Sequence, residues 1–410
     1  MLQKLKNYYR DPLYKNSLYI MLNSVTGALF GFIFWMIAAR YYSSWDVGLA
    51  TALISSAGII VNLSSFGLNT GIIRFLPGST EKTQLFSSIW IVSIAGALIF
   101  GFIFLIGIDI FSPQMKFLMN PLVIVIFILL LIFQMSSGLF NNALLALRKA
   151  EYSFAQNMGL GLRIILLIPL TFAGVLGIFG SLGIAFFASF GIGLFLLYRM
   201  NILIKPVLKK NLLNDVFHFS LANYIADFLV MAESAILPIL ILNVIGAKEA
   251  AYFYVAFSIA GLLYAVPNAL FISMFIEGSH GMPLRKNMIK ALAAAGVIMI
   301  PVGIVIFFFG DILLNLFSRE YSQNAYEILK LLVLSSFFVV FNALFICVER
   351  IRKNIKPIIV INAVLFAVTV IASYFFMQHY GVMGVGMGWI AGQGVSSIVA
   401  GGIAWIERRD

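Results

Sequence analysis

The sequence contains little of what soluble enzymes and metalloproteins use. Its 410 residues include one cysteine, Cys347, which excludes an intramolecular disulfide and a cysteine-based metal site. The three histidines, His218, His280 and His379, lie far apart in the sequence and do not resemble a ligand set for zinc or iron. Only 10% of the residues are charged, against about a quarter in a typical soluble domain. The chain therefore lacks the polar residues that would cover a water-exposed surface.

The loops also lack the sequence patterns of catalysis. They contain no Gly-rich phosphate loop, no nucleophile elbow and no pair of catalytic carboxylates. The longest predicted outer loop, residues 108–120, holds one lysine and one aspartate. A membrane glycosyltransferase or polymerase usually carries a larger loop with several acidic residues. We predict that the protein is not an enzyme, with no catalytic residues, no cofactor and no metal.

The sequence is instead rich in hydrophobic residues, at 62%, with a mean hydropathy of +1.02. A helix needs about 20 mostly apolar residues to cross a bilayer, because lipid offers no partners for open backbone groups. The alternating pattern of a membrane β-barrel is absent. We predict an all-α polytopic membrane protein with twelve transmembrane helices. The predicted spans lie near residues 16–39, 46–70, 85–107, 121–146, 154–177, 181–200, 218–244, 250–276, 288–309, 323–347, 356–377 and 383–405.

The lysines and arginines predict the orientation of these spans. If the N-terminus is inside, the inner segments hold 21 of the 27 basic residues and the outer segments hold five. Because basic residues concentrate on the cytoplasmic side, we predict that both termini are cytoplasmic. Residues 1–15 are predicted to form a basic arm at the membrane interface. The net charge of +11 then indicates contact with anionic lipids, and not with nucleic acid.

The two halves of the sequence resemble each other at a nearly constant offset. Ser17-Leu18 matches Ser220-Leu221, and Asn142-Ala143-Leu144 matches Asn342-Ala343-Leu344. Because each half has six spans, the two copies have the same orientation in the membrane. We predict an N-lobe at residues 16–200, a cytoplasmic amphipathic linker at 201–217 and a C-lobe at 218–406.

The first apolar hairpin carries the motifs of a known family. Residues 38–49 read AARYYSSWDVGL, and Phe66-Gly67-Leu68 and Ile72-Ile73-Arg74-Phe75 follow. This order resembles the polysaccharide-biosynthesis or O-antigen flippases, the Wzx-type branch of the multidrug/oligosaccharidyl-lipid/polysaccharide (MOP) superfamily, which includes the MATE transporters. The resemblance implies two six-helix lobes in a V, around a central cavity that opens alternately to the two sides.

The resemblance also implies the cargo and its pathway. The cargo would be a polyprenyl-diphosphate-linked oligosaccharide, a precursor of a cell-surface glycan, which is flipped outward across the cytoplasmic membrane of a prokaryote. Its partners would be anionic membrane lipids and the glycan polymerase or glycosyltransferases of the same pathway. The main alternative is a MATE-type cation-coupled antiporter of drugs or small molecules, and the others are a glycosyltransferase or polymerase and a structural scaffold. The first span lacks the acidic residue through which drug exporters commonly couple cations, which favours the oligosaccharide.

Three charged residues are predicted inside spans, where each costs about 2.5–3.5 kcal/mol on insertion scales. Arg163 lies nine residues into the fifth span, and we predict that it binds an anionic diphosphate or sugar acid in a cavity; a structural ion pair is the alternative. Asp227 lies at the same depth in the seventh span, and a pair with Arg163 in one state is a further hypothesis. Glu233 is a candidate for proton or cation coupling, or for a hydrogen bond between helices.

Small polar residues extend these candidate sites. Asn223, Asp227 and Ser234 share one face of the seventh span, and Ser24 lies on the corresponding face of the first span. We predict that these faces line the substrate cavity. The alternative is that small polar residues pack helix against helix.

Other positions have two interpretations each. Arg74 ends the second span, where it either anchors the helix at the interface or binds the diphosphate. Pro238 and Pro267 each remove a helical hydrogen bond, so they are candidate hinges or static bends. Asn342 and Gln393 are amides within spans that either bind sugar hydroxyls or bond one helix to another.

Overall fold

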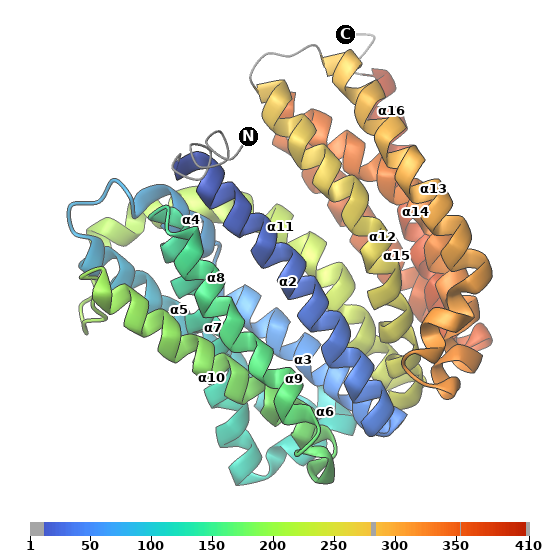
Figure 1. Cartoon of the computed structure of the whole chain (residues 1–410), viewed down its shortest axis with the longest axis horizontal. Helices are drawn as coiled ribbons and strands as arrows, with labels where there is room; N and C mark the ends of the chain where they lie inside the picture. Colours follow the sequence, from blue (N-terminus) through green and yellow to red (C-terminus); the bar gives the residue numbers. More distant parts are fainter. Residues whose placement is uncertain (1–11, 280–283, 353, 407–410) are drawn as a thin grey trace, which may run out of the picture. The chain divides into compact units, whose positions relative to one another are not determined.

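The computed structural model describes residues 12–279, 284–352 and 354–406 (Figure 1). In these ranges the chain is helical, and none of the described residues forms a strand. This confirms the predicted all-α membrane fold. The orientation of the termini and the lobe boundaries stay predictions.

The chain forms two compact units that are divided inside two helices. Unit 1 combines the described part of Met1–Ser43 with Ser56–Ile225, and unit 2 combines Ser44–Ser55 with Ala226–Asp410. The divisions fall within α3 (Ser44–Ser65) and α11 (Lys210–Val244). Each of these helices therefore has one part in each unit.

Unit 1 is built around apolar side chains of α4, α5, α7 and α10 that are fully buried, such as Leu68, Phe86 and Phe140. Asn120 begins α7, and its Oδ1 accepts a hydrogen bond from the Leu122 amide at 3.0 Å. The other elements of unit 1 are α2 (Pro12–Tyr41), α4 (Leu68–Phe75), α5 (Lys82–Ile106), α6 (Ile108–Phe111), η1 (Pro113–Met119), α7 (Pro121–Ala146), α8 (Ala150–Met158), η2 (Gly159–Gly161), α9 (Leu162–Leu167), η3 (Thr171–Ala173) and α10 (Val175–Arg199).

Ten of the described helices are long and apolar enough to cross a membrane, and Met231–Val244 of α11 adds a shorter apolar segment. The predicted fifth span is not one continuous helix to residue 177. It contains α8, η2, α9 and η3. The backbone stays helical through residues 159–168, and the helix ends after the proline at 169 in a turn that includes Gly174, whose φ is +53°.

Unit 2 contains α12 (Ala247–Ser279), α13 (Leu284–Asn315), α14 (Arg319–Arg352), α15 (Ile355–Tyr380) and α16 (Val382–Ile406), coloured yellow to red in Figure 1. The last two form a hairpin through Gly381, whose φ of +56° favours glycine.

Glycines spaced by four residues let α16 lie unusually close to α15. A Cβ at Gly384 would overlap the backbone of Phe376, and a Cβ at Gly392 would overlap the Thr369 hydroxyl. Small residues at this spacing allow two membrane helices to approach closely. The approach matters for the site, because Thr369 is thereby held between α16 and α11.

Candidate functional site

A cavity of about 180 Å³ lies in unit 1 between α2, α8, η2 and α9. We call it the Arg163 cavity. Its polar lining residues are Asn23, Ser24, Thr26, Asn157 and Arg163, and the apolar Phe30 also lines it. Ser24 and Arg163, two of the residues predicted to line the substrate cavity, both line this cavity. Whether it is the substrate cavity, and what these residues bind, stay predictions.

Hydrogen bonds between amides fix the walls of the Arg163 cavity. Asn157 of α8 donates from Nδ2 to Asn23 Oδ1 of α2 at 2.8 Å. Asn23 and Asn141 in turn donate to the Ser153 hydroxyl, at 3.4 and 2.9 Å. A network of this kind restricts side-chain rotation, so the remaining polar atoms are held in place for a ligand.

The short helix α9 positions the guanidinium of Arg163. Its carbon Cζ lies 5.2 Å from the centroid of the Phe34 ring, which is buried in α2. The end of α9 is fixed because Tyr42 donates a hydrogen bond to the Leu167 carbonyl at 2.7 Å. The guanidinium carries five donors in a planar fork that matches the oxygens of a phosphate. The arrangement can therefore bind an anion within a membrane helix bundle.

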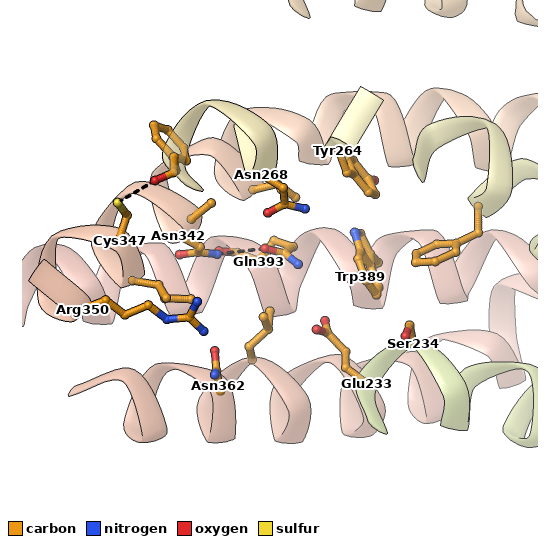
Figure 2. Close-up of a pocket in the computed structure, with 16 residues that line it drawn as sticks. Glu233, Ser234, Tyr264, Asn268, Asn342, Cys347, Arg350, Asn362, Trp389 and Gln393 are labelled. Carbon is orange, nitrogen blue, oxygen red and sulfur yellow. Dashed lines mark hydrogen bonds between the residues drawn. The ribbon is translucent and has the colours of Figure 1, made fainter. Parts of the chain in front are cut away.

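A second cavity, of about 390 Å³, lies within unit 2 and is shown in Figure 2. We call it the Glu233 cavity. Glu233 of α11 is only 5% exposed, and its carboxyl group points into the cavity (Figure 2). Its Oε1 accepts a hydrogen bond from Thr369 of α15 at 3.1 Å. No basic residue in the described ranges forms an ion pair with Glu233 within 4.0 Å.

Amides from α14 and α16 form another wall of the Glu233 cavity. Asn342 donates to the Gln393 Oε1 at 2.9 Å, as the dashed line in Figure 2 shows, and to the Gln393 carbonyl at 3.0 Å. Ser397 donates to the Asn342 Oδ1 at 2.9 Å. Asn362 of α15 and Asn268 of α12 also line the cavity. Helix-to-helix bonding by Asn342 and Gln393, one of the two interpretations from the sequence, is therefore present, and both residues also face the cavity.

Aromatic rings close the part of the cavity near Glu233. The Trp389 ring lies nearly parallel to that of Tyr264, at 12° and 6.3 Å between centroids, and meets Phe257 at 80° and 4.9 Å. Tyr264 is fixed because its hydroxyl donates to the Leu332 carbonyl at 2.7 Å. Arg350 lines the cavity at its other end, beside Cys347 (Figure 2). The cavity is thus lined by a carboxyl group, several amides and a guanidinium, together with aromatic rings.

The other candidate residues from the sequence lie as follows. Glu233 and Ser234 line the same cavity. The sequence had placed only Ser234, and not Glu233, on the cavity-lining face of the seventh span. Asn223 and Asp227 are in α11, but their side chains lie outside the described part of the structure, so their pairing and coupling hypotheses stay predictions. Arg74 is exposed at the end of α4 and lines neither cavity.

The two candidate hinge prolines lie inside helices. Pro238 is within α11, and Pro267 is within α12. Both helices continue through their proline, so neither position ends a helix. Whether they bend during transport stays a prediction.

Several residues of both cavities were not predicted. Asn23 and Asn157 in unit 1, and Thr369, Trp389 and Arg350 in unit 2, were missed. Asn157 lies six residues before Arg163, so a search for polar residues near each buried charge would have included it. Thr369 and Trp389 carry no comparable signal, because threonine and tryptophan are common in membrane spans.

A family model for polysaccharide biosynthesis proteins matches residues 13–236, which is more than half of the chain. The protein belongs to this family. The match confirms the resemblance seen in the first hairpin. None of the curated proteins compared with the chain matches it.

Solved structures of membrane flippases and transporters share the fold of this chain. The lipid II flippase MurJ in an inward closed conformation is similar with a TM-score of 0.78 at 13% identity, over 93% of this chain and 86% of MurJ. An inward-facing MATE multidrug resistance transporter of the MOP superfamily is similar with a TM-score of 0.69 at 18% identity, over 93% and 94% of the two chains. The MATE multidrug transporter DinF-BH gives a TM-score of 0.66 at 15% identity, over 97% and 96% of the two chains.

The family match and the shared fold support a polytopic helical membrane protein of the polysaccharide biosynthesis family. The neighbours of known structure are themselves named as flippases and transporters. Of the twelve predicted spans, ten correspond to continuous candidate spans in the described residues. The other two are the seventh, which corresponds to the shorter apolar segment Met231–Val244 of α11, and the divided fifth.

Proposed function

We propose that the protein flips a polyprenyl-diphosphate-linked oligosaccharide across the cytoplasmic membrane of a prokaryote by alternating access. The cargo is a precursor of a cell-surface polysaccharide. The partners are the anionic lipids of that membrane and the glycosyltransferases or polymerase that make and use the glycan.

The Arg163 cavity is the observation that supports an anionic cargo. A guanidinium inside a membrane helix bundle is costly unless it serves a partner or a ligand. Here it lies among the amides of Asn23 and Asn157, which are fixed by their own hydrogen bonds. A diphosphate presents several oxygens that accept hydrogen bonds from guanidinium and amide groups together. Binding in this cavity would hold the charged part of the cargo away from the lipid.

The family supports the lipid-linked nature of the cargo. The matching family model is described by polysaccharide biosynthesis, and one structural neighbour, MurJ, is named as a lipid II flippase. A polysaccharide precursor that is made in the cytoplasm has to cross the membrane before it is used outside. A transporter in such a pathway therefore moves a glycan on its lipid carrier.

Energy coupling is proposed to involve α11. Glu233 is a buried carboxyl group without an ion pair among the described residues, and Asp227 lies six residues before it in the same helix. A carboxyl group in this environment can exchange a proton or a monovalent cation as the protein changes state. Pro238, also in α11, is the proposed hinge for that movement, and Pro267 in α12 is the second.

The second candidate function is a cation-coupled antiporter of small molecules. It is favoured by the same buried carboxyl group, Glu233, and by the likeness of the fold to MATE multidrug transporters. The two functions differ in the charge of the cargo. The diphosphate needs the cation Arg163, whereas a cationic drug does not.

The test is transport by the purified protein in proteoliposomes. A fluorescent polyprenyl-diphosphate sugar is supplied on one face, and its movement is measured with and without a proton gradient. We expect Arg163→Ala to slow flipping about tenfold or more, because hydrogen bonds to charged groups contribute about 1.5–3 kcal/mol. Arg163→Lys should recover part of the rate, since lysine retains the charge but not the planar fork.

A matched control is Arg199→Ala, because Arg199 also lies over a phenylalanine ring, 5.9 Å from Phe195, but is exposed at the end of α10. It should flip the cargo at the wild-type rate. A full rate in Arg163→Ala would contradict the proposal. Uptake of a soluble organic cation, with no movement of any polyprenyl cargo, would establish the antiporter instead.

A further inference from the structure

We propose that the Glu233 cavity within unit 2 is a binding site for a sugar residue, recognised through its hydroxyl groups. This inference rests on the proposed function for the presence of a glycan in the cargo. The proposed sugar site lies wholly within unit 2.

Glu233 is the residue that most strongly indicates a ligand. It is 95% buried, its carboxyl group points into the cavity, and its one hydrogen bond within the described residues comes from Thr369 to Oε1. A carboxyl group offers several lone pairs and is costly to bury with few hydrogen bonds. Adjacent hydroxyl groups of a sugar can form hydrogen bonds with one carboxyl group. The geometry therefore leaves Oε2 of Glu233 for a donor that the described part of the protein does not supply.

The amides around the cavity complement a polyhydroxyl compound. The Oε1 of Gln393 is held by Asn342, so the Nε2 group lies on the opposite side of the amide, away from Asn342 (Figure 2). Asn268 is exposed and Asn362 is 2% exposed, and both line the same cavity. Each amide can donate and accept, as a sugar hydroxyl also does. A neutral sugar can satisfy such a set without bringing a charge into the membrane.

The aromatic rings of the cavity complement the apolar C–H face of a sugar. Trp389, Phe257 and Tyr264 present apolar ring surface beside the carboxyl group of Glu233. Sugars have an apolar C–H face as well as polar edges, and aromatic rings attract C–H groups through their negative faces. Rings beside Glu233 and amides further along the cavity together provide the apolar and polar surfaces that a sugar needs.

The dimensions are those of an elongated ligand site. The volume of about 390 Å³ lies in the common range of small-molecule sites, which is about 300–1,000 Å³. The lining runs along α12 from Phe257 to Phe271, which is about 21 Å at 1.5 Å per residue. The cavity is therefore long enough to hold one sugar beside Glu233 and to continue toward Arg350.

A cation fits the same cavity less well. Arg350 lines it, and a second positive charge would be repelled from the cavity. The acceptor oxygens of Gln393 and Asn342 are already used by Asn342 and Ser397. The described residues contain no group of three or more acidic, histidine or cysteine side chains that could hold a metal ion. These observations favour a neutral sugar.

The test is binding of soluble sugars to the purified full-length protein in lipid nanodiscs. The probes are methyl glycosides of hexoses, 6-deoxyhexoses and N-acetylhexosamines, measured by calorimetry and by tryptophan fluorescence. We expect saturable binding of at least one class. Of the five tryptophans, Trp389 should give the fluorescence signal, so Trp389→Phe should abolish the signal.

Two variants test the assignment of residues. Glu233→Gln should weaken sugar binding about tenfold, because an amide does not replace both oxygens of the carboxyl group as hydrogen-bond partners. Asn268→Leu should weaken it about fivefold, the effect of one neutral hydrogen bond, and the fold should tolerate it because the side chain is exposed. The control is Glu327→Gln, an exposed glutamate of α14 that pairs with Lys330 and should bind sugars like the wild type.

The outcomes separate this inference from the proposed function. Sugar binding that depends on Glu233, without flipping of a lipid-linked cargo, would support the site and reject the flippase. Flipping without any binding of soluble sugars would overturn the site. Wild-type sugar affinity in Glu233→Gln, with loss of the response to a proton gradient, would also overturn it and would make Glu233 a coupling carboxyl. Binding of an organic cation alone would overturn it too.

Discussion

Replacing Gly392 by alanine tests the close approach of α15 and α16 that holds Thr369 near Glu233. A Cβ at Gly392 would overlap the Thr369 hydroxyl and lie 3.0 Å from both Cβ and the backbone nitrogen of Thr369. The backbone nitrogen cannot rotate away, so α15 and α16 would have to separate. Gly394 is the matched control, since its Cβ would lie 3.7–3.9 Å from the Phe338 ring, an ordinary contact distance.

The expected difference in stability follows from these contacts. Alanine is favoured over glycine in a helix by about 1 kcal/mol, and this gain is shared by both variants. Overpacking costs about 1–3 kcal/mol, and it applies to Gly392→Ala alone. We therefore expect Gly392→Ala to be less stable than Gly394→Ala by about 1–3 kcal/mol. For domains of about 150–250 residues this corresponds to a melting temperature that is about 2–12 °C lower.

Thermal unfolding of both purified variants in the same detergent measures this difference. The same comparison in a Thr369→Ala background should show a smaller penalty for Gly392→Ala, because the hydroxyl that the Cβ meets is gone. Equal melting temperatures for Gly392→Ala and Gly394→Ala would refute the reasoning, because they would mean that α15 and α16 are not in close contact at this level.

Two further variants test the walls of the cavities. Tyr264→Phe removes a hydroxyl that bonds the Leu332 carbonyl and Ser335, and we expect it to lower the free energy of unfolding by about 1 kcal/mol. Thermal unfolding measures this, and unchanged stability would count against the observed hydrogen bonds. Asn157→Leu removes the donor to Asn23, and we expect flipping in proteoliposomes to slow about fivefold and the free energy of unfolding to fall by about 1 kcal/mol. A wild-type flipping rate would show that the amide wall of the Arg163 cavity does not contact the cargo.

The sequence found one charged residue of each cavity, because a charge inside a membrane span is rare and costly. Arg163 and Glu233 were identified in this way, and each lines a cavity of the structure. Ser234 was identified from its helical spacing to Asp227, and Ser24 from the corresponding face of the first span. The same reasoning did not separate a serine that lines a cavity from one that packs against a helix. Ser220 is such a case, since it is fully buried against Gly71 in unit 1.

The division of the fifth span shows a second limit. The hydropathy of residues 154–177 predicts one continuous helix, because apolar content measures only the preference for lipid. The backbone stays helical through α8, η2 and α9, and the helix ends in a turn at residues 170–174, before α10 begins. Arg163 therefore lies within this helical segment, beside α2.

The sequence by itself determined the class of the protein, because the scarcity of charge and the length of the apolar segments leave lipid as its solvent. It also determined the family, through the ordered motifs of the first hairpin. Only the tertiary structure decided which side chains meet. Helical periodicity gives the direction of a side chain on its own helix, but not the neighbouring helix that it faces. That Glu233 meets Thr369 and shares a cavity with Trp389 and Asn342 follows from the packing of α11 with α15 and α16, which glycines such as Gly392 allow.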